Sequence, residues 1–346
     1  QTHRLALNAE AMELVTKDSV YHPVHLGIDA DISPDHIHAT TNAGDLRLDF
    51  RSRQGPDSLL ARCDAFLAEL KRQTDSLSLR QDTLRTLLPD ARLYARCGGN
   101  NPVSNLLRSA IGYTYSDLNV DLSTNPTDGI KGDAYIIGLN TGAALLDTIS
   151  LGILQKDDVV RMKGRVRNGP KNRTAVFESE VLAEITPTGL AATATFTDAK
   201  GTKGVDMGLE ADILGDGMKV HFTPLNPVIA YRKFTINEDN FIELTKDGRL
   251  EALVDLLADD GTGVQMFSTE NPDAKQDFTV NVNHLNLGEL SSVMPYMPEI
   301  QGFLHGDFHL MQADSLTTVS AMMDVKGMKY EGTPMGDIGL NAVYFP

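Results

Sequence analysis

The sequence predicts a mainly β protein with a small helical part. Along most of its 346 residues, apolar and polar side chains alternate with the two-residue period of a strand that has one dry face. Glycine and proline turn signals recur about every 8–12 residues, which is typical of strands joined by short hairpins. Only residues 57–88 repeat apolar side chains at helical spacing. Together these patterns favour about 16–20 strands.

Composition and charge narrow the class of protein. Apolar residues make up 41% of the chain and charged residues 23%, which is typical of a globular protein. The formal net charge is -16, so the surface repels nucleic-acid phosphates and anionic lipid headgroups. We therefore expect no nucleic-acid partner and no electrostatic docking onto a bilayer.

The chain offers no obvious anchor and no disulfide framework. No stretch reaches the roughly 20 apolar residues of a spanning helix, because polar residues interrupt the longest one, 136–154. The chain begins with Gln1 and stops in mid-pattern, which predicts a piece of a longer, processed protein. Two unpaired thiols are the simpler interpretation of Cys63 and Cys97, and a bridge between them is the alternative.

The first 88 residues predict a β segment followed by an inserted helical hairpin. In segment 1–56, apolar residues alternate over 5–11, 26–32 and 46–50, and Pro34 marks a turn. In segment 57–88, Asp57 after Pro56 suits a helix start, and Pro89 ends a second helical stretch. We expect this hairpin to lie on one end of the sheet, with a partner-binding arm as the alternative.

Residues 89–346 predict one continuous sheet with short helices near 142–154 and 287–295. The clearest strands are 160–167, with Arg and Lys on its polar face, and 175–185, with Glu on its polar face. Such strands favour antiparallel pairing through cross-strand ion pairs.

The sequence leaves three ways in which this sheet can bury its apolar face. Two sheets can pack as a sandwich, the sheet can close on itself, or it can curl lengthwise around an apolar trough. Burying an apolar side chain is worth about 1.5–3 kcal/mol, so a trough must fold partly on itself or hold apolar guests. The inward-facing strand residues are the candidate lining. They are Leu118, Val120, Leu122, Val160, Met162, Val166, Phe177, Val181, Ile185, Phe196, Val205, Met207, Leu209, Val220, Phe222, Phe234, Ile236, Phe278, Val280, Val282, Phe308, Leu310, Met323 and Val325.

Candidates for metal binding or catalysis are few. The histidine candidates are His22 with His25, Asp35 with His36 and His38, and His305 with His309. A zinc site needs three or four such ligands within tetrahedral reach, and solvated side chains are the simpler interpretation. Signatures of hydrolases, zinc proteases, P-loops and dinucleotide sites are missing from the sequence. We therefore expect no enzyme, no catalytic residues, no metal and no cofactor.

Three stretches carry a resemblance to a known family. They are LNLGEL at 285–290 with IQGFLHGDF at 300–308, then GTPMGDIG at 332–339, and the segment 230–264, in which LEALV follows shortly after Asp247-Gly248. On these stretches the chain resembles the TamB/AsmA-like family, in particular the Bacteroidetes-type homologues of the translocation and assembly module TamB. The resemblance covers about residues 100–346 well and 1–56 less well, and it does not include 57–88.

The resemblance implies a long antiparallel sheet curled into a taco-like shape with an open apolar groove. It implies a periplasmic part of an inner-membrane-anchored protein that shields phospholipid acyl chains between the inner and outer membranes. The alternative role is a structural module that assists outer-membrane protein assembly with an Omp85-type barrel partner. The remainder of its own longer chain is a further expected partner.

These observations rank three hypotheses. A lipid-handling scaffold comes first. A structural and interaction module, which binds through sheet edges or the 57–88 hairpin, comes second. A carbohydrate-active or metal-dependent enzyme comes third.

Overall fold

The computed structural model describes residues 2–17, 20–271, 274–295, 297–313 and 316–345, without the side chains at positions 14 and 21–23. The chain divides into two units, Gln1–Pro187 and Thr188–Pro346. The predicted fold class is confirmed, because the chain is mainly β, its strands pair antiparallel and its helices are a small part. The structure has 22 strands along the described residues, somewhat more than expected.

Unit 1 is a meander in which each strand pairs with the next along the chain. Its elements are β1 (His3–Val15), β2 (Val20–Ile32), β3 (Ile37–Ala43), β4 (Leu46–Ser52), α1 (Pro56–Asp75), α2 (Gln81–Leu87), β5 (Ala91–Gly98), α3 (Pro102–Ile111), β6 (Asp117–Asn125), β7 (Gly129–Asn140), β8 (Leu145–Lys156), β9 (Val159–Asn168) and β10 (Phe177–Thr186). Within the unit, β1 and β10 are the two edges of the sheet.

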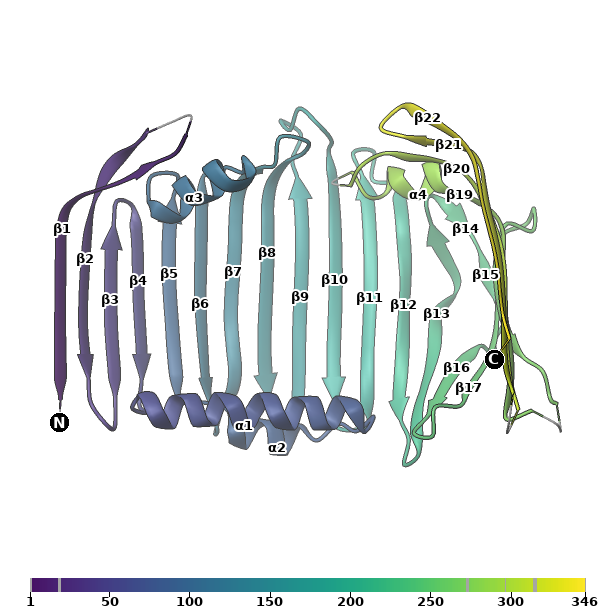
Figure 1. Cartoon of the computed structure of the whole chain (residues 1–346), viewed down its shortest axis with the longest axis horizontal. Helices are drawn as coiled ribbons and strands as arrows, with labels where there is room; N and C mark the ends of the chain where they lie inside the picture. Colours follow the sequence, from purple (N-terminus) through teal and green to yellow (C-terminus); the bar gives the residue numbers. More distant parts are fainter. Residues whose placement is uncertain (1, 18–19, 272–273, 296, 314–315, 346) are drawn as a thin grey trace. The chain divides into compact units, whose positions relative to one another are not determined.

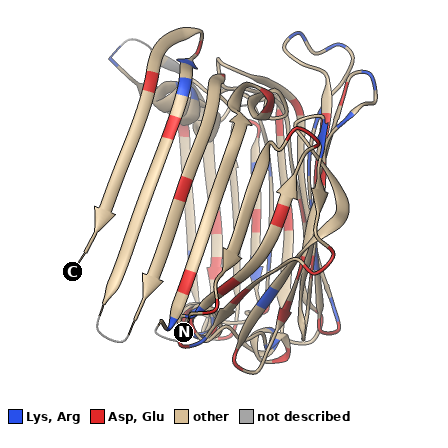
Figure 2. Ribbon diagram, turned by 90° about the vertical axis from the view of Figure 1, so that its right-hand side faces the viewer, with Lys and Arg blue, Asp and Glu red and all other residues tan. Residues whose placement is uncertain are grey.

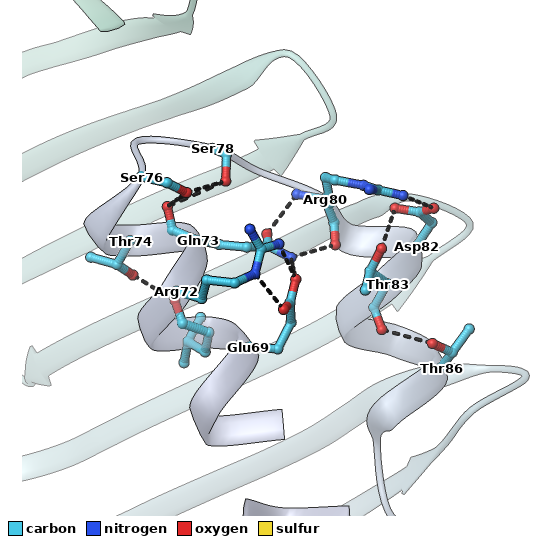
Figure 3. Close-up of polar contacts among 11 residues, drawn as sticks. Glu69, Arg72, Gln73, Thr74, Ser76, Ser78, Arg80, Asp82, Thr83 and Thr86 are labelled. Atoms are coloured by element: carbon cyan, nitrogen blue, oxygen red, sulfur yellow. Dashed lines mark hydrogen bonds and ion pairs between the residues drawn. The ribbon is translucent and has the colours of Figure 1, made fainter. Parts of the chain in front are cut away.

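Helices α1 and α2 form the hairpin predicted for 57–88, and they lie across one end of the unit 1 strands (Figure 1). The Arg62 guanidinium joins them, because it donates to the carbonyls of Leu88 at 3.1 Å and Thr86 at 2.6 Å. The Arg85 guanidinium donates to the carbonyl of Asp157 at 2.9 Å, in the turn between β8 and β9. Side-chain contacts at the loop end of the hairpin fix the α1–α2 loop (Figure 3).

Unit 2 continues the antiparallel pattern with a less regular order of pairing. Its elements are β11 (Gly189–Asp198), β12 (Lys203–Ile213), β13 (Gly217–Ile229), β14 (Arg232–Lys233), β15 (Thr235–Ile236), β16 (Phe241–Thr245), β17 (Leu250–Leu257), β18 (Gly263–Ser268), β19 (Gln276–Asn286), α4 (Leu287–Ser292), β20 (Ile300–Gln312), β21 (Thr317–Tyr330) and β22 (Thr333–Tyr344). Strand β13 pairs with β12, β14 and β16, and β17 pairs with both β15 and β16. From β17 to β22, each strand pairs with the next.

The prediction of a short helix near 142–154 is wrong. Residues Leu145–Lys156 form β8, which pairs with β7 on one side and β9 on the other. Ile149 and Ile153 fit helical spacing, but Ile149, Leu151 and Ile153 fit strand alternation as well. Backbone pairing with two neighbouring strands, which local spacing cannot reveal, decides for the strand.

Helix α3 was not predicted; it lies in the connection between β5 and β6, which still pair with each other, so it does not interrupt the sheet. Asn101 caps this helix, and its side chain accepts a hydrogen bond from the Ser104 backbone N–H at 3.0 Å. Gly112 ends it with a φ of 73°, the left-handed conformation that favours glycine. The other short helix, expected near 287–295, is present as α4 and ends at Ser292.

Both cysteines are free thiols, so the simpler of the two interpretations of Cys63 and Cys97 is confirmed. None of the helices in the described part of the chain combines the length and apolarity needed to cross a bilayer.

Candidate functional site

One face of the unit 1 sheet is apolar from edge to edge. Cross-strand register places side chains of all ten strands in rows, and two central rows contain a single polar residue, Thr41. The first row is Leu7, Ile28, Thr41, Leu48, Ala95, Val120, Ala134, Leu151, Gly164 and Val181. The second row is Leu5, Ala30, Ala39, Phe50, Leu93, Leu122, Gly132, Ile153, Met162 and Ala183. We call this surface the unit 1 apolar face.

The opposite face of the same strands is charged. The two strands predicted to pair through their charges do so, and Arg161–Glu184 and Arg165–Glu178 approach to 2.6 Å across β9 and β10. Within β4, a hydrogen bond from the Arg51 guanidinium holds the pKa of Asp49 below its ordinary value. Exposed ion pairs contribute little stability each, so their main effect is to keep this face hydrated.

Among the described residues of unit 1, no second layer covers the unit 1 apolar face. Leu5 and Leu151 are each 57% exposed, and Val181 is 49% exposed. Over the whole chain the exposed area is 20089 Å² for a mass of 37.7 kDa. A compact monomer of that mass exposes about 14,000 Å², and two separate compact domains of half the mass expose about 17,000 Å² together. The excess indicates a sheet with one layer of side chains on each face.

Unit 2 has an apolar face of its own. The row Val254, Met266, Val280, Phe308, Ala321 and Ala342 runs from β17 to β22 without a polar residue. Figure 2 shows that charged residues are sparse along the strand ending at the C-terminus and its neighbours. At β22 this face is open, since Leu340 is 53% exposed and Tyr344 57%.

Near β12, β13, β15, β17 and β18, the unit 2 apolar face closes around a recess of about 180 Å³. Met207, Phe222, Ile236, Val254 and Met266 contribute to its walls. An apolar cavity of about 150 Å³ is large enough to take up benzene. The recess can therefore hold a short hydrocarbon segment.

The predicted lining residues lie on these two faces, with one class of exceptions. Those on β6, β9 and β10 share the unit 1 apolar face, and those on β12, β13 and β19–β21 share the unit 2 face. Six of the 24 are buried and cannot form open lining, because their neighbours cover them. They are Phe177, Phe196, Phe234, Ile236, Phe278 and Val325.

The sequence prediction omitted the lining that β1–β5, β7 and β8 provide. Leu5, Leu7, Ile28 and Phe50 alternate clearly in the sequence, so their parity was a sufficient signal. Leu151 was omitted because its segment was assigned to a helix, which hid its strand parity.

The histidine candidates do not assemble into a metal site. Among the described side chains, no three of His, Cys, Asp and Glu lie close enough to hold an ion. His36 contacts Asp35 at 3.2 Å, and His38 lies 3.5 Å from Asp49. The side chain of His22 lies outside the described part of the structure.

The later histidines each find a different partner. His305 lies 3.3 Å from His284, and His309 lies 2.7 Å from Asp277. A hydrogen bond from His309 lowers the pKa of the Asp277 carboxyl, as expected for a simple ion pair. The geometry does not bring His305 and His309 together around one site.

The most buried reactive group is the Cys97 thiol, 3.1 Å from the Tyr115 hydroxyl. Burial raises the pKa of Cys97 and also that of Tyr115. A buried thiol with a raised pKa is a poor nucleophile, because the thiolate is the reactive form. This pair therefore supports the end of the sheet beside Asn101 and gives no basis for catalysis.

No protein family, curated protein or solved structure matches the chain.

Proposed function

We propose that the chain is a non-enzymatic scaffold whose apolar sheet faces shield the acyl chains of phospholipids. The observation that carries this proposal is the unit 1 apolar face, which spans ten strands and lacks a covering layer. Apolar area left in water costs about 25 cal/mol per Å², so a ligand that covers such a face binds favourably. Acyl chains suit the face because it offers aliphatic contact and almost no hydrogen-bonding groups.

The TamB/AsmA-like resemblance supports a location for this activity. On that resemblance, the chain is a periplasmic part of a longer, membrane-anchored protein that carries phospholipids between the inner and outer membranes. The polar face, with its ion pairs, stays in water while the apolar face holds the lipid.

Two neighbouring residues of β10 allow a matched test of which face binds. Val181 is 49% exposed on the unit 1 apolar face, and Leu182 is 42% exposed on the polar face. Val181→Asp places a carboxylate among acyl chains, where an unpaired charge is strongly unfavourable. Leu182→Asp makes the same kind of change on the hydrated side.

Phospholipid bound to each purified protein is measured by mass spectrometry of organic extracts. We expect Val181→Asp to lose most of the lipid and Leu182→Asp to retain it. Wild-type protein free of lipid, or equal loss in the two variants, contradicts the proposal.

A second candidate function is an interaction module that assists outer-membrane protein assembly. The observation in its favour is the exposure of three leucines along α1: Leu60 at 62%, Leu67 at 59% and Leu70 at 41%. Replacing Leu60 and Leu67 by Lys should abolish binding to an Omp85-type barrel without changing lipid content. Loss of lipid in that variant, or unchanged barrel binding, counts against this second role.

A further inference from the structure

Helix α3 is arranged opposite to an ordinary surface helix. Its buried residues are polar, since Ser104 is 3% and Asn105 is 7% exposed. Its exposed residues include three large aliphatic side chains, Val103 at 42%, Leu106 at 59% and Ile111 at 54%, beside the polar Arg108 and Ser109. A surface helix normally turns its apolar stripe inward, so this reversed arrangement needs a partner outside the described chain.

The tip of the β1–β2 hairpin extends the exposed aliphatic surface. Val15 is 64% and Val20 61% exposed at that tip. Between the hairpin and α3 lies a recess of about 270 Å³ whose lining includes Met12, Val24 and Leu106. We call α3, this recess and the side chains of Val15 and Val20 the α3 surface.

The charges on and beside α3 distinguish it from the rest of the molecule. In a chain of net charge -16, α3 contains no Asp or Glu, and its one charged residue is Arg108. Lys17 lies near the hairpin tip, and Glu13 lines the recess. By contrast α1, which also exposes leucines, carries Asp57, Asp64, Glu69 and Asp75.

These features favour a lipid bilayer over a protein as the occupant of the α3 surface. The exposed apolar side chains are aliphatic, with no aromatic anchor and no ring of hydrogen-bonding groups, which specific protein interfaces generally have. Amphipathic helices bind bilayers by burying their apolar side at the headgroup boundary, with a strength that grows with the apolar area buried. No acidic residue of α3 opposes such insertion. Figure 1 places α3 at the strand ends opposite α1 and α2, at the rim of the unit 1 sheet.

We propose that the α3 surface docks onto a phospholipid bilayer, so that acyl chains pass from the bilayer to the unit 1 apolar face. This inference rests on the proposed lipid-shielding function and adds the entry point. Docking occurs by apolar insertion and not by charge attraction, because the net charge of the whole chain is strongly negative.

Vesicle flotation with phosphatidylcholine tests the docking step. The altered protein is the double variant Leu106→Asp and Ile111→Asp. The matched control is Leu60→Asp and Leu67→Asp on α1, where Leu67 has the same 59% exposure as Leu106. Wild type and the α1 control should float with the vesicles, and the α3 variant should bind at least about tenfold more weakly. Circular dichroism of the variants checks that each remains folded.

Two further measurements separate docking from lipid shielding. Binding should not increase when phosphatidylglycerol is added to the vesicles, and salt should not reverse it. Val181→Asp should float like wild type while losing bound lipid. The proposal is overturned if wild type does not float, if both double variants float equally, or if binding needs anionic lipid. Failure of lipid shielding alone would appear as lipid-free wild-type protein that still floats.

Discussion

Gln73 should be the residue that holds the α1–α2 hairpin closed. It is 2% exposed at the end of α1, although glutamine is usually a surface residue. Its side-chain amide donates to the Glu69 carboxylate at 2.7 Å and to the Arg80 carbonyl at 3.2 Å, and its side-chain oxygen accepts from the Arg80 N–H at 2.6 Å (Figure 3). One side chain thus connects the last turns of α1 to the residue that precedes α2.

The perturbation is Gln73→Leu, which keeps most of the volume and removes all three hydrogen bonds. Only the two bonds to Arg80 cross from α1 to the segment before α2, and each contributes a net of about 0.5–1.5 kcal/mol. We therefore expect a loss of about 1–3 kcal/mol in the free energy of opening the hairpin. Thr74→Ala is the control, because Thr74 is exposed and bonds only within α1, to the Leu70 carbonyl. Its effect should stay within about 0.5 kcal/mol.

The assay must report on the hairpin itself, because a peripheral element can open without global unfolding. Native-state hydrogen exchange at α1 and α2 measures that opening, and backbone amides in β6 and β7 serve as the internal reference. Exchange in Gln73→Leu no faster than in Thr74→Ala would refute the assignment. If Gln73→Leu raised the exchange rate in β6 and β7 as much as in α1 and α2, the hairpin would open only together with the whole sheet.

Three further predictions concern single residues. Hydrogen bonds from Arg72, and to a smaller extent from Gln73, lower the pKa of Glu69 from 4.5 to about 2. The ionised Glu69 therefore stabilises the hairpin fully above about pH 4.5, and this stabilisation is lost as the pH falls toward 2. Circular dichroism should show a smaller change between these two pH values for Glu69→Gln than for wild type. A Cβ on Gly189 would lie 2.1 Å from the Ala211 carbonyl oxygen, whereas one on Gly164 meets no atom within 4 Å. Gly189→Ala should therefore cost about 1–3 kcal/mol in chemical denaturation, and an effect no larger than that of Gly164→Ala would contradict this. Asn101, 0% exposed, caps α3 and donates to Asp45 and the Gly98 carbonyl at 2.7 Å, so Asn101→Ala should cost about 2–4 kcal/mol and weaken vesicle flotation together with α3.

The strand pattern was predictable because each strand carries its own alternation. β9 and β10 could be paired from sequence, since the charges of Arg161 and Glu184 on their polar faces are complementary. Helix α3 was predictable in principle, because Asn101 followed by Pro102, with Gly112 ten residues later, is a complete set of helix boundary signals. Strand β8 was not predictable, because its apolar residues fit both the helical and the strand period. Only its pairing with β7 and β9 decides between a helix and a strand.

The alternation of apolar and polar residues predicted which side of each strand is apolar. It could not distinguish apolar residues that are buried from those that are exposed. Phe177 and Val181 share one strand and one face, yet Phe177 is 3% and Val181 49% exposed. The alternation within the strand is the same at both positions and carries no signal for this difference. For the same reason, six of the predicted lining residues proved to be buried.

The distribution of side-chain size explains how an open apolar face can remain a regular sheet. In the two central rows of unit 1, small residues such as Ala134, Gly132 and Gly164 lie beside larger ones such as Leu151 and Met162. Uniformly large side chains in these rows would fill the space above the face. The small residues instead leave space on the apolar side, as the empty surroundings of Gly164 show. An apolar surface with space above it gains little stability from packing against the same chain, and in the lipid-shielding proposal an acyl chain takes up that space.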